Sequence, residues 1–204
     1  MPISSSHLSE TARTSRIQER GMTLLELLFA MAILAVGMTG AMGMVLAAVE
    51  SDARNKNDTA AVVLDQEILE QFATYQNYPA TGTLTINDCS NGAASTHIAS
   101  LASAAAPGAG ATTYTSATAP FPGNVGDIDW TQPAPAMATS ASAGYAMDYQ
   151  TCNGDVYEVR WNILQLNGVT RLAQLTVSSR QIESQGSKVA MMFSIPTTLH
   201  TVVD

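Results

Sequence analysis

Residues 20–49 read RGMTLLELLFAMAILAVGMTGAMGMVLAAV, and the last 23 of them, from Leu27 to Val49, carry no charge. A helix of that length measures about 35 Å, which is enough to cross a hydrocarbon core of about 30 Å. A buried helix of a soluble protein as long as this one would show a polar stripe, and this run has none. The stretch therefore predicts a transmembrane helix.

The charges on the two sides of the apolar run predict its orientation. Basic residues dominate before it, whereas the signs are mixed after it. The residues concerned are Glu10, Arg13, Arg16, Glu19 and Arg20 on the first side, and Glu50, Asp52, Arg54, Lys56 and Asp58 on the second. Because cytoplasmic flanks carry the excess of Lys and Arg, we expect the N-terminus in the cytoplasm and the rest of the chain outside.

Glu26 lies immediately before the apolar run. A carboxylate at the edge of a membrane helix costs free energy and by default has a function. A secretory signal peptide has no use for it, and the apolar region of such a peptide is usually about 7–15 residues long. Val45-Leu46-Ala47 does imitate a signal cleavage site. A secreted or anchored binding protein with an atypical signal segment therefore stays an alternative.

The segment Arg20-Gly21-Met22-Thr23-Leu24-Leu25-Glu26, followed by LLFAMAILAVG, resembles the N-terminus of type IV prepilins. In that family a dedicated inner-membrane peptidase cuts after the glycine, on the cytoplasmic side, and N-methylates the new first residue. The resemblance implies a cleaved basic leader over residues 1–21, a cut between Gly21 and Met22, and methylation of Met22. The family usually has Phe after the glycine, and Met22 departs from that pattern.

The resemblance also gives Glu26 a role, because this residue becomes the fifth after the cut. Apolar helices of neighbouring subunits pack in a filament core, where an unpaired carboxylate is expensive. The family pairs it with the N-terminal amine of a neighbouring subunit, which sets the axial register. The alternative is that Glu26 only reaches the lipid headgroups. Gly37, Gly40 and Gly43 allow close helix approach or local softening, and the alternative is that they are simply tolerated in a membrane helix, where glycine is common.

Residues 50–77 are amphipathic and continue the helix. Large apolar side chains recur at helical spacing, at Leu64, Ile68, Phe72 and Tyr75. Polar residues occupy the other faces, among them Asp65, Gln66, Glu67, Glu70 and Gln71. Tyr78-Pro79 disfavours further helix. We therefore expect one helix from about Met22 to Gln76, with residues 22–49 as its transmembrane and filament-core half.

Residues 78–144 are rich in Ala, Ser, Thr, Gly and Pro and contain few large apolar side chains. Such a composition buries little surface, so we expect a region of long loops. Within it, residues 83–86 are compatible with a short strand and residues 95–106 with a short helix.

Residues 145–204 carry the clearest strand signals and predict an antiparallel sheet. Apolar and polar side chains alternate over 157–163, which predicts a half-buried strand, and again over 173–177. Asn167-Gly168 between them predicts a hairpin turn, and a last run over 189–195 ends at Pro196. The expected fold class is α+β and pilin-like. Its long N-terminal helix packs, by its second half, on a small antiparallel sheet of three or four strands with long irregular loops.

Cys89 and Cys152 are the two cysteines. The predicted topology places both outside the inner membrane, where disulfides form. A bond between them would constrain the unfolded chain by about 4 kcal/mol in the loop-entropy account, and two free thiols are the alternative. Two cysteines this far apart lack the ligand count of a zinc site, so we expect no metal and no cofactor.

Composition and motifs argue against two further classes of function. Nine basic residues against seventeen acidic ones disfavour a general nucleic-acid binder, so no nucleic-acid partner is expected. The chain has no G-x-S-x-G, P-loop or H-E-x-x-H motif, and we expect no enzymatic activity. Cys89 with His97 is a poor candidate for a thiol nucleophile, and Asp127-Ile128-Asp129 lacks the ligand count of a calcium loop.

The long first helix, together with the Tyr-x-Val-x-Trp strand, looks most like the PilV-type minor pilins. The sequence is thus interpreted as the precursor of a type IV pilus minor pilin. Such a precursor is a single-pass inner-membrane protein with a periplasmic C-terminal domain, and it later joins a cell-surface filament. Its expected partners are prepilin peptidase, other pilins or minor pilins and the inner-membrane assembly platform. The alternative within this class is a pseudopilin of a type II secretion system.

Overall fold

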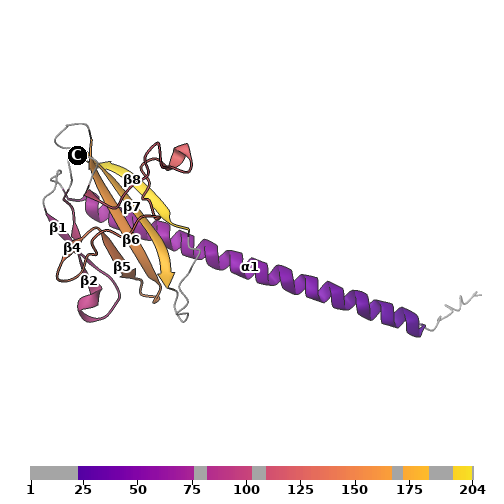
Figure 1. The fold of residues 1–204 in the computed structure, drawn as a ribbon. Helices are drawn as coiled ribbons and strands as arrows, with labels where there is room; N and C mark the ends of the chain where they lie inside the picture. Colours follow the sequence, from indigo (N-terminus) through magenta and orange to yellow (C-terminus); the bar gives the residue numbers. More distant parts are fainter. Residues whose placement is uncertain (1–22, 76–81, 103–108, 167–171, 184–194, 204) are drawn as a thin grey trace, which may run out of the picture. The chain divides into compact units, whose positions relative to one another are not determined.

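The computed structural model describes residues 23–75, 82–102, 109–166, 172–183 and 195–203 (Figure 1). The chain divides into two units between Glu50 and Ser51. The long helix α1, Leu24–Ala73, contributes residues to both units. The units are described separately below.

The first unit consists of the N-terminal part of α1. Its residues 24–50 are all exposed within the chain. A helix of this length measures about 40 Å, longer than the hydrocarbon core of a bilayer. α1 is also the one helix among the described residues that is long and apolar enough to cross a membrane.

The helix ends slightly before the predicted boundary. The last helical residue is Ala73, and Thr74 and Tyr75 follow it outside the helix. Tyr75, expected on the helical stripe, still packs partly against the core. The other predicted ends, Met22 and Gln76, lie outside the described residues.

The second unit is built on a five-stranded sheet. Its strands are β3 (Ala109–Gly110), β5 (Ala146–Gln150), β6 (Val156–Gln165), β7 (Ala173–Glu183) and β8 (Thr197–Val203). The order is β3-β6-β7-β8, and β5 also pairs with β6. Every pairing in this main sheet is antiparallel. The long strands β6 and β7 form its centre.

The alternation in the sequence gives β6 one face that packs on α1. Tyr157, Val159, Trp161 and Ile163 are at most 1% exposed and belong to the same core as the α1 stripe. Phe72 of α1 meets Trp161 edge to face, with ring centroids 5.4 Å apart. Aromatic pairs of this geometry contribute about 0.5–1.5 kcal/mol beyond their burial. The predicted packing of the second half of the helix on a sheet is confirmed.

The opposite face of β6 is buried as well, so the prediction of a half-buried strand was wrong. Glu158, Arg160 and Asn162 are between 4% and 9% exposed. The long segment between β3 and β4 covers them: the Asn162 side chain donates to the carbonyl of Ala111 at 2.6 Å. The Arg160 and Arg180 guanidinium groups lie 4.3 Å and 4.5 Å from the ring centroid of Trp130.

The same two arginines also form ion pairs with the carboxylate of Glu158, which holds their guanidinium groups against the Trp130 ring. Arg160 and Arg180 each place a nitrogen 2.7 Å from an oxygen of Glu158. The Trp130 ring nitrogen donates to Ser178 at 2.9 Å. Cation–π contacts of partly desolvated groups contribute about 0.5–2 kcal/mol each. Trp130, Arg160 and Arg180 thus help to hold the segment between β3 and β4 on the main sheet, together with the bond from Asn162 to Ala111.

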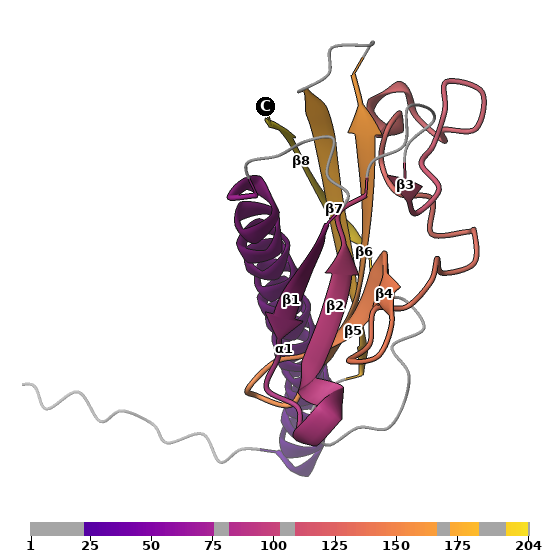
Figure 2. The ribbon, with the colours of Figure 1, turned by 90° about the vertical axis from the view of Figure 1, so that its left-hand side faces the viewer.

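A second, three-stranded sheet lies in the region predicted to be loops. It consists of β1 (Thr83–Asn87), β2 (Thr96–Ser100) and β4 (Ala143–Gly144), in the order β1-β2-β4. β1 and β2 run antiparallel side by side (Figure 2), and β4 joins β2 in parallel. The expected strand at residues 83–86 is confirmed. The expected helix at 95–106 is wrong, because 96–100 form β2 and only the short 3₁₀ turn Gly92–Ser95 precedes it.

The C-terminal prediction was partly correct. β6 and β7 fall where alternation placed them, and they pair with Gln165 opposite Ala173. The hairpin turn at Asn167-Gly168 and the run 189–194 lie outside the described residues. The strand that pairs with β7 in the described part of the chain is β8, which follows Pro196 rather than preceding it.

Candidate functional site

The described part of the prepilin-like motif begins at Thr23, which caps α1. The backbone N–H of Glu26 donates to the Thr23 hydroxyl at 3.3 Å and to the Thr23 carbonyl at 3.0 Å. Thr23-x-x-Glu26 is the sequence pattern of a capping box. Glu26 lies in the first turn, where the helix dipole favours a negative charge. Thr23 therefore sets the start of the helix, and Glu26 lies one turn inside it. Gly21 and Met22 lie outside the described residues.

The helix after this cap presents apolar side chains on all sides. Fifteen large apolar side chains between residues 24 and 49 are from 49% to 81% exposed. They are Leu24, Leu25, Leu27, Leu28, Phe29, Met31, Ile33, Leu34, Val36, Met38, Met42, Met44, Val45, Leu46 and Val49. Water is a poor solvent for a contiguous apolar surface of this size. This segment therefore requires lipid or the apolar helices of other chains around it.

The three glycines of this segment leave open space beside the helix. A Cβ atom added at Gly37, Gly40 or Gly43 would meet nothing within 4 Å in this chain. The structure thus gives the glycines no packing role within the subunit. Both interpretations from the sequence, close approach of another helix and local softening, remain compatible with this geometry.

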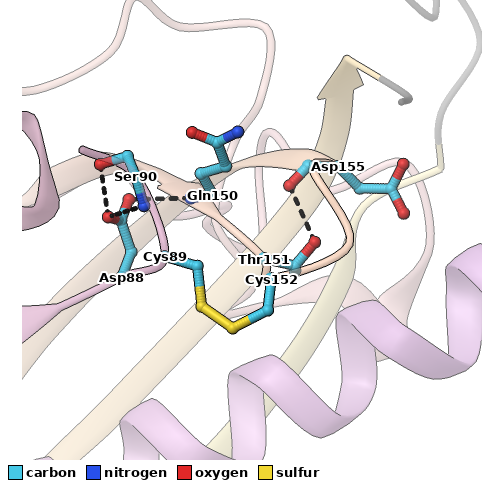
Figure 3. The surroundings of a disulfide bond; sticks show 7 residues. All are labelled: Asp88, Cys89, Ser90, Gln150, Thr151, Cys152 and Asp155. Carbon is cyan, nitrogen blue, oxygen red and sulfur yellow. Dashed lines mark hydrogen bonds between the residues drawn. A yellow bond between two sulfur atoms is a disulfide. The ribbon is translucent and has the colours of Figure 1, made fainter. Parts of the chain in front are cut away.

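Cys89 and Cys152 form a disulfide that joins the two sheets (Figure 3). Cys89 follows β1 and Cys152 follows β5, and their Cα atoms are 4.9 Å apart. The Cys89 N–H also donates to the carbonyl of Gln150 at 3.0 Å. Because both sulfur atoms are bonded, neither is a thiol nucleophile, which removes the Cys89–His97 alternative.

Asp65 is a buried carboxyl between α1 and the sheet, although the sequence placed it on a polar face of the helix. Its side chain is 0% exposed, and the Thr197 hydroxyl donates to it at 2.6 Å. Burial raises the pKa of Asp65 to about 6, and hydrogen bonds from Thr197 and Ser179 act in the opposite direction. A spacing signal existed, since Asp65 follows Ala61 by four residues and precedes Ile68 by three.

The two aspartates considered for calcium serve as hydrogen-bond acceptors in the loop. Asp127 lies 2.8 Å from the Nε2 atom of His200 and accepts a bond from Asn124 at 2.9 Å. Asp129 accepts bonds from the backbone and hydroxyl of Thr131. Within the described ranges, no three His, Cys, Asp or Glu side chains are placed to hold a metal ion.

Comparison with known proteins places one motif on the chain. The family described as "Prokaryotic N-terminal methylation motif" matches residues 16–42. The match covers Gly21, Met22, Glu26 and the apolar run as far as Met42. No curated protein and no solved structure matches the chain.

Proposed function

We propose that this chain is a type IV minor pilin precursor of the PilV type. Prepilin peptidase cuts it between Gly21 and Met22 and methylates Met22, and the mature subunit then joins or primes a pilus filament. The observation that carries the proposal is the methylation motif at residues 16–42, which includes the start of a helix whose apolar residues 24–49 are exposed within the chain. The pilin-like α+β fold of the second unit supports it.

The leader accounts for the chemistry of the cut. Gly21 has no side chain, so a protease can approach its backbone closely. Cleavage removes the three leader arginines, which hold the N-terminus in the cytoplasm, and creates a new α-amine on Met22. The subunit is then free to leave the bilayer for a filament of other pilins, with the inner-membrane assembly platform as the machinery that extracts it.

The new amine and Glu26 complement each other inside such a filament. Glu26 lies in the first turn of α1, which Thr23 caps, and it is the fifth residue of a chain that begins at Met22. In a dry core the carboxylate is tolerated only when it is paired, and the amine of a neighbouring subunit supplies the opposite charge. The pairing then selects one axial register, as a buried polar group does in a coiled coil.

The second unit serves as the part that the filament presents. Within this unit the main sheet packs on residues 61–72 of α1 through buried apolar contacts. The Cys89–Cys152 disulfide links its two sheets and is compatible with the oxidising periplasm and cell exterior. The proposed localisation is therefore the inner membrane first, with the N-terminus in the cytoplasm and this unit in the periplasm, and afterwards the cell surface.

Substitution of the proposed cleavage residue tests this function. Gly21→Ala should block maturation and leave a larger, membrane-bound precursor, which immunoblotting of membrane fractions detects. Gly37→Ala is the matched control, because a methyl group there meets nothing within 4 Å, and it should mature normally. Normal maturation of Gly21→Ala would contradict the assignment.

A pseudopilin of a type II secretion system is the second candidate, because its N-terminus would carry the same motif. Purification of the mature protein with its filament separates the two. Recovery with other pilins supports the pilus assignment, and recovery with secretion-system pseudopilins would replace it.

A further inference from the structure

His97 holds a position that the proposed function does not explain. It lies on β2 and is 6% exposed. Its Nε2 atom is 3.1 Å from Oδ2 of Asp88, and its Nδ1 atom is 3.2 Å from the carbonyl oxygen of Ala138. Both ring nitrogens are thus within hydrogen-bonding distance of an oxygen atom.

Asp88 meets the ring as an ionised carboxylate. Its Oδ1 atom accepts bonds from the backbone and hydroxyl of Ser90, at 2.9 Å and 2.6 Å, and its Oδ2 atom accepts the N–H of Gln150 at 2.9 Å (Figure 3). Burial acts to raise the pKa of Asp88, but the hydrogen bonds from Ser90, Gln150 and His97 outweigh it, and the pKa is lowered. Asp88 therefore accepts hydrogen bonds and donates none.

The second partner is also an acceptor, because a backbone carbonyl has no hydrogen to donate. A neutral imidazole carries one N–H and could satisfy only one of the two oxygens. An imidazolium carries two and satisfies both. We propose that His97 is held as a doubly protonated imidazolium, a clamp that holds β2 to the two segments that carry Asp88 and Ala138 and opens when one of its protons is lost.

The surroundings favour a positive charge at this place. His97 lines a hollow of about 470 Å³ together with Met137, Ala138 and Thr139, and Asp148 on β5 lines it as well. Among the described residues that line this hollow there is no lysine or arginine. Asp88, which contacts the ring, and Asp148, which lines the hollow, are both acidic.

The clamp lies beside the disulfide and connects the same parts of the chain. Asp88 immediately precedes Cys89, and Gln150, which donates to Asp88, is two residues before Cys152. Ala138 belongs to the segment before β4, and its N–H donates to Ala146 of β5 at 2.6 Å. The two residues that His97 contacts, Asp88 and Ala138, are thus the ones that bond to β5 of the main sheet through Gln150 and Ala146.

The direction of the pH dependence follows from the proton count. The clamp is complete while the ring holds both protons. As the pH rises and one proton leaves, either Asp88 or the Ala138 carbonyl loses the hydrogen bond from the ring. We therefore expect the contacts of residues 88–90 and 138 around the His97 ring to weaken as the pH rises.

Nuclear magnetic resonance of the full chain in detergent micelles, labelled with ¹⁵N-histidine, tests this directly. We expect two N–H signals from the His97 ring at near-neutral pH. His200 is the internal control: its Nε2 atom faces Asp127 at 2.8 Å, but its Nδ1 atom faces the Thr176 hydroxyl at 2.9 Å, which can donate as well as accept. The contacts of His200 therefore require only one ring N–H. His97→Gln identifies the signals.

The second test uses the variant Asp88→Asn, because this substitution removes the negative charge beside His97 and nearly preserves the shape of the side chain. In this variant the His97 ring should keep only one of its two N–H signals at near-neutral pH. A single N–H on His97 in the wild-type chain would overturn the proposal, and so would two N–H signals that persist in Asp88→Asn. The wild-type spectrum decides alone if the variant does not form its disulfide, and neither arm depends on filament assembly.

Discussion

Asp65 and Glu26 are two acidic residues beside apolar surroundings. Asp65 is buried between α1 and the main sheet, where the Thr197 hydroxyl donates to it at 2.6 Å. Glu26 lies in the first turn of α1, at the start of the apolar half of the helix, which the proposed function places in lipid or among neighbouring helices. A carboxylate in such a place is retained only where its position serves something other than stability. The two residues therefore give different predictions.

Asp65 should make the second unit less stable as the pH rises. Its pKa is raised from 3.8 to about 6, so between these values the folded chain keeps a proton that the unfolded chain has lost. The free energy of unfolding should fall across this window by up to about 3 kcal/mol. Relative to the wild type, Asp65→Asn should gain that amount between about pH 4 and about pH 7.5 in urea titrations.

Val63→Ala is the control for this measurement, because Val63 is exposed on the same helix and the substitution changes no ionisable group. Its difference from the wild type should stay nearly constant over the same pH range. A constant difference for Asp65→Asn as well would contradict the raised pKa of the buried carboxyl.

Glu26 should matter for assembly and not for folding of the second unit. Glu26→Gln removes the charge and leaves the neighbouring amine unpaired in the filament core, a loss of several kcal/mol. We expect at least about tenfold less of this variant in sheared filament fractions, since each 1.4 kcal/mol is tenfold, with maturation largely intact. Glu70→Gln, at an exposed site near the end of α1, should assemble normally. Equal incorporation of Glu26→Gln and Glu70→Gln would rule out the pairing.

At the scale of elements, α1 meets two kinds of surroundings within one helix. Its first half is apolar all round and exposed within the chain, whereas its second half buries one stripe against the sheet. The change in periodicity near residue 50 follows from this, because a helix in lipid needs no polar face and a helix on a sheet does. A sequence pattern of this type is readable without a structure.

Phe72 should be the strongest single contact of that second half. It is 0% exposed and packs against Trp161. Phe72→Ala should lower the free energy of unfolding by about 3–5 kcal/mol in urea titrations that follow tryptophan fluorescence. Val63→Ala, at a position that is 58% exposed, should change it by about 0.5 kcal/mol or less. Similar losses for both variants would mean that the helix does not pack through this face.

The strands show which elements the sequence could predict. β6 and β7 are long, and their alternation is regular, so they were placed correctly. β8 was missed because its Thr and His residues dilute the apolar signal that marks a strand. β2 was missed because it reads Thr-His-Ile-Ala-Ser within an Ala-rich stretch. Short strands of this composition form only because a neighbouring strand supplies their hydrogen bonds.

At the scale of the whole molecule, the functional motif was readable from the sequence and most of the second unit was not. The motif consists of neighbouring residues with fixed spacing, from Gly21 to Glu26. By contrast, Asp88 and Gln150 meet across 62 positions, and Trp130 and Ser178 across 48. Such contacts depend on how the sheets pair, which no local pattern specifies. The same holds for the burial of Glu158 behind the loop.

The properties of the two units agree with a subunit that is first anchored in a membrane and then assembled into a filament. The first unit requires an apolar environment, and the second is a folded domain with a disulfide and its own core. Under the proposed function, removal of the leader changes the first unit from a bilayer anchor into a filament component without altering the second. The identity of the first residue of the mature chain therefore decides between this account and a secreted protein released from its signal.

Mass spectrometry of the N-terminal peptide of the mature protein, isolated from membrane and filament fractions, tests this claim most directly. We predict a chain that begins at Met22 with a methylated α-amine and keeps the apolar helix. A mature protein that begins near Ala48 and is recovered free in the periplasm would contradict the account.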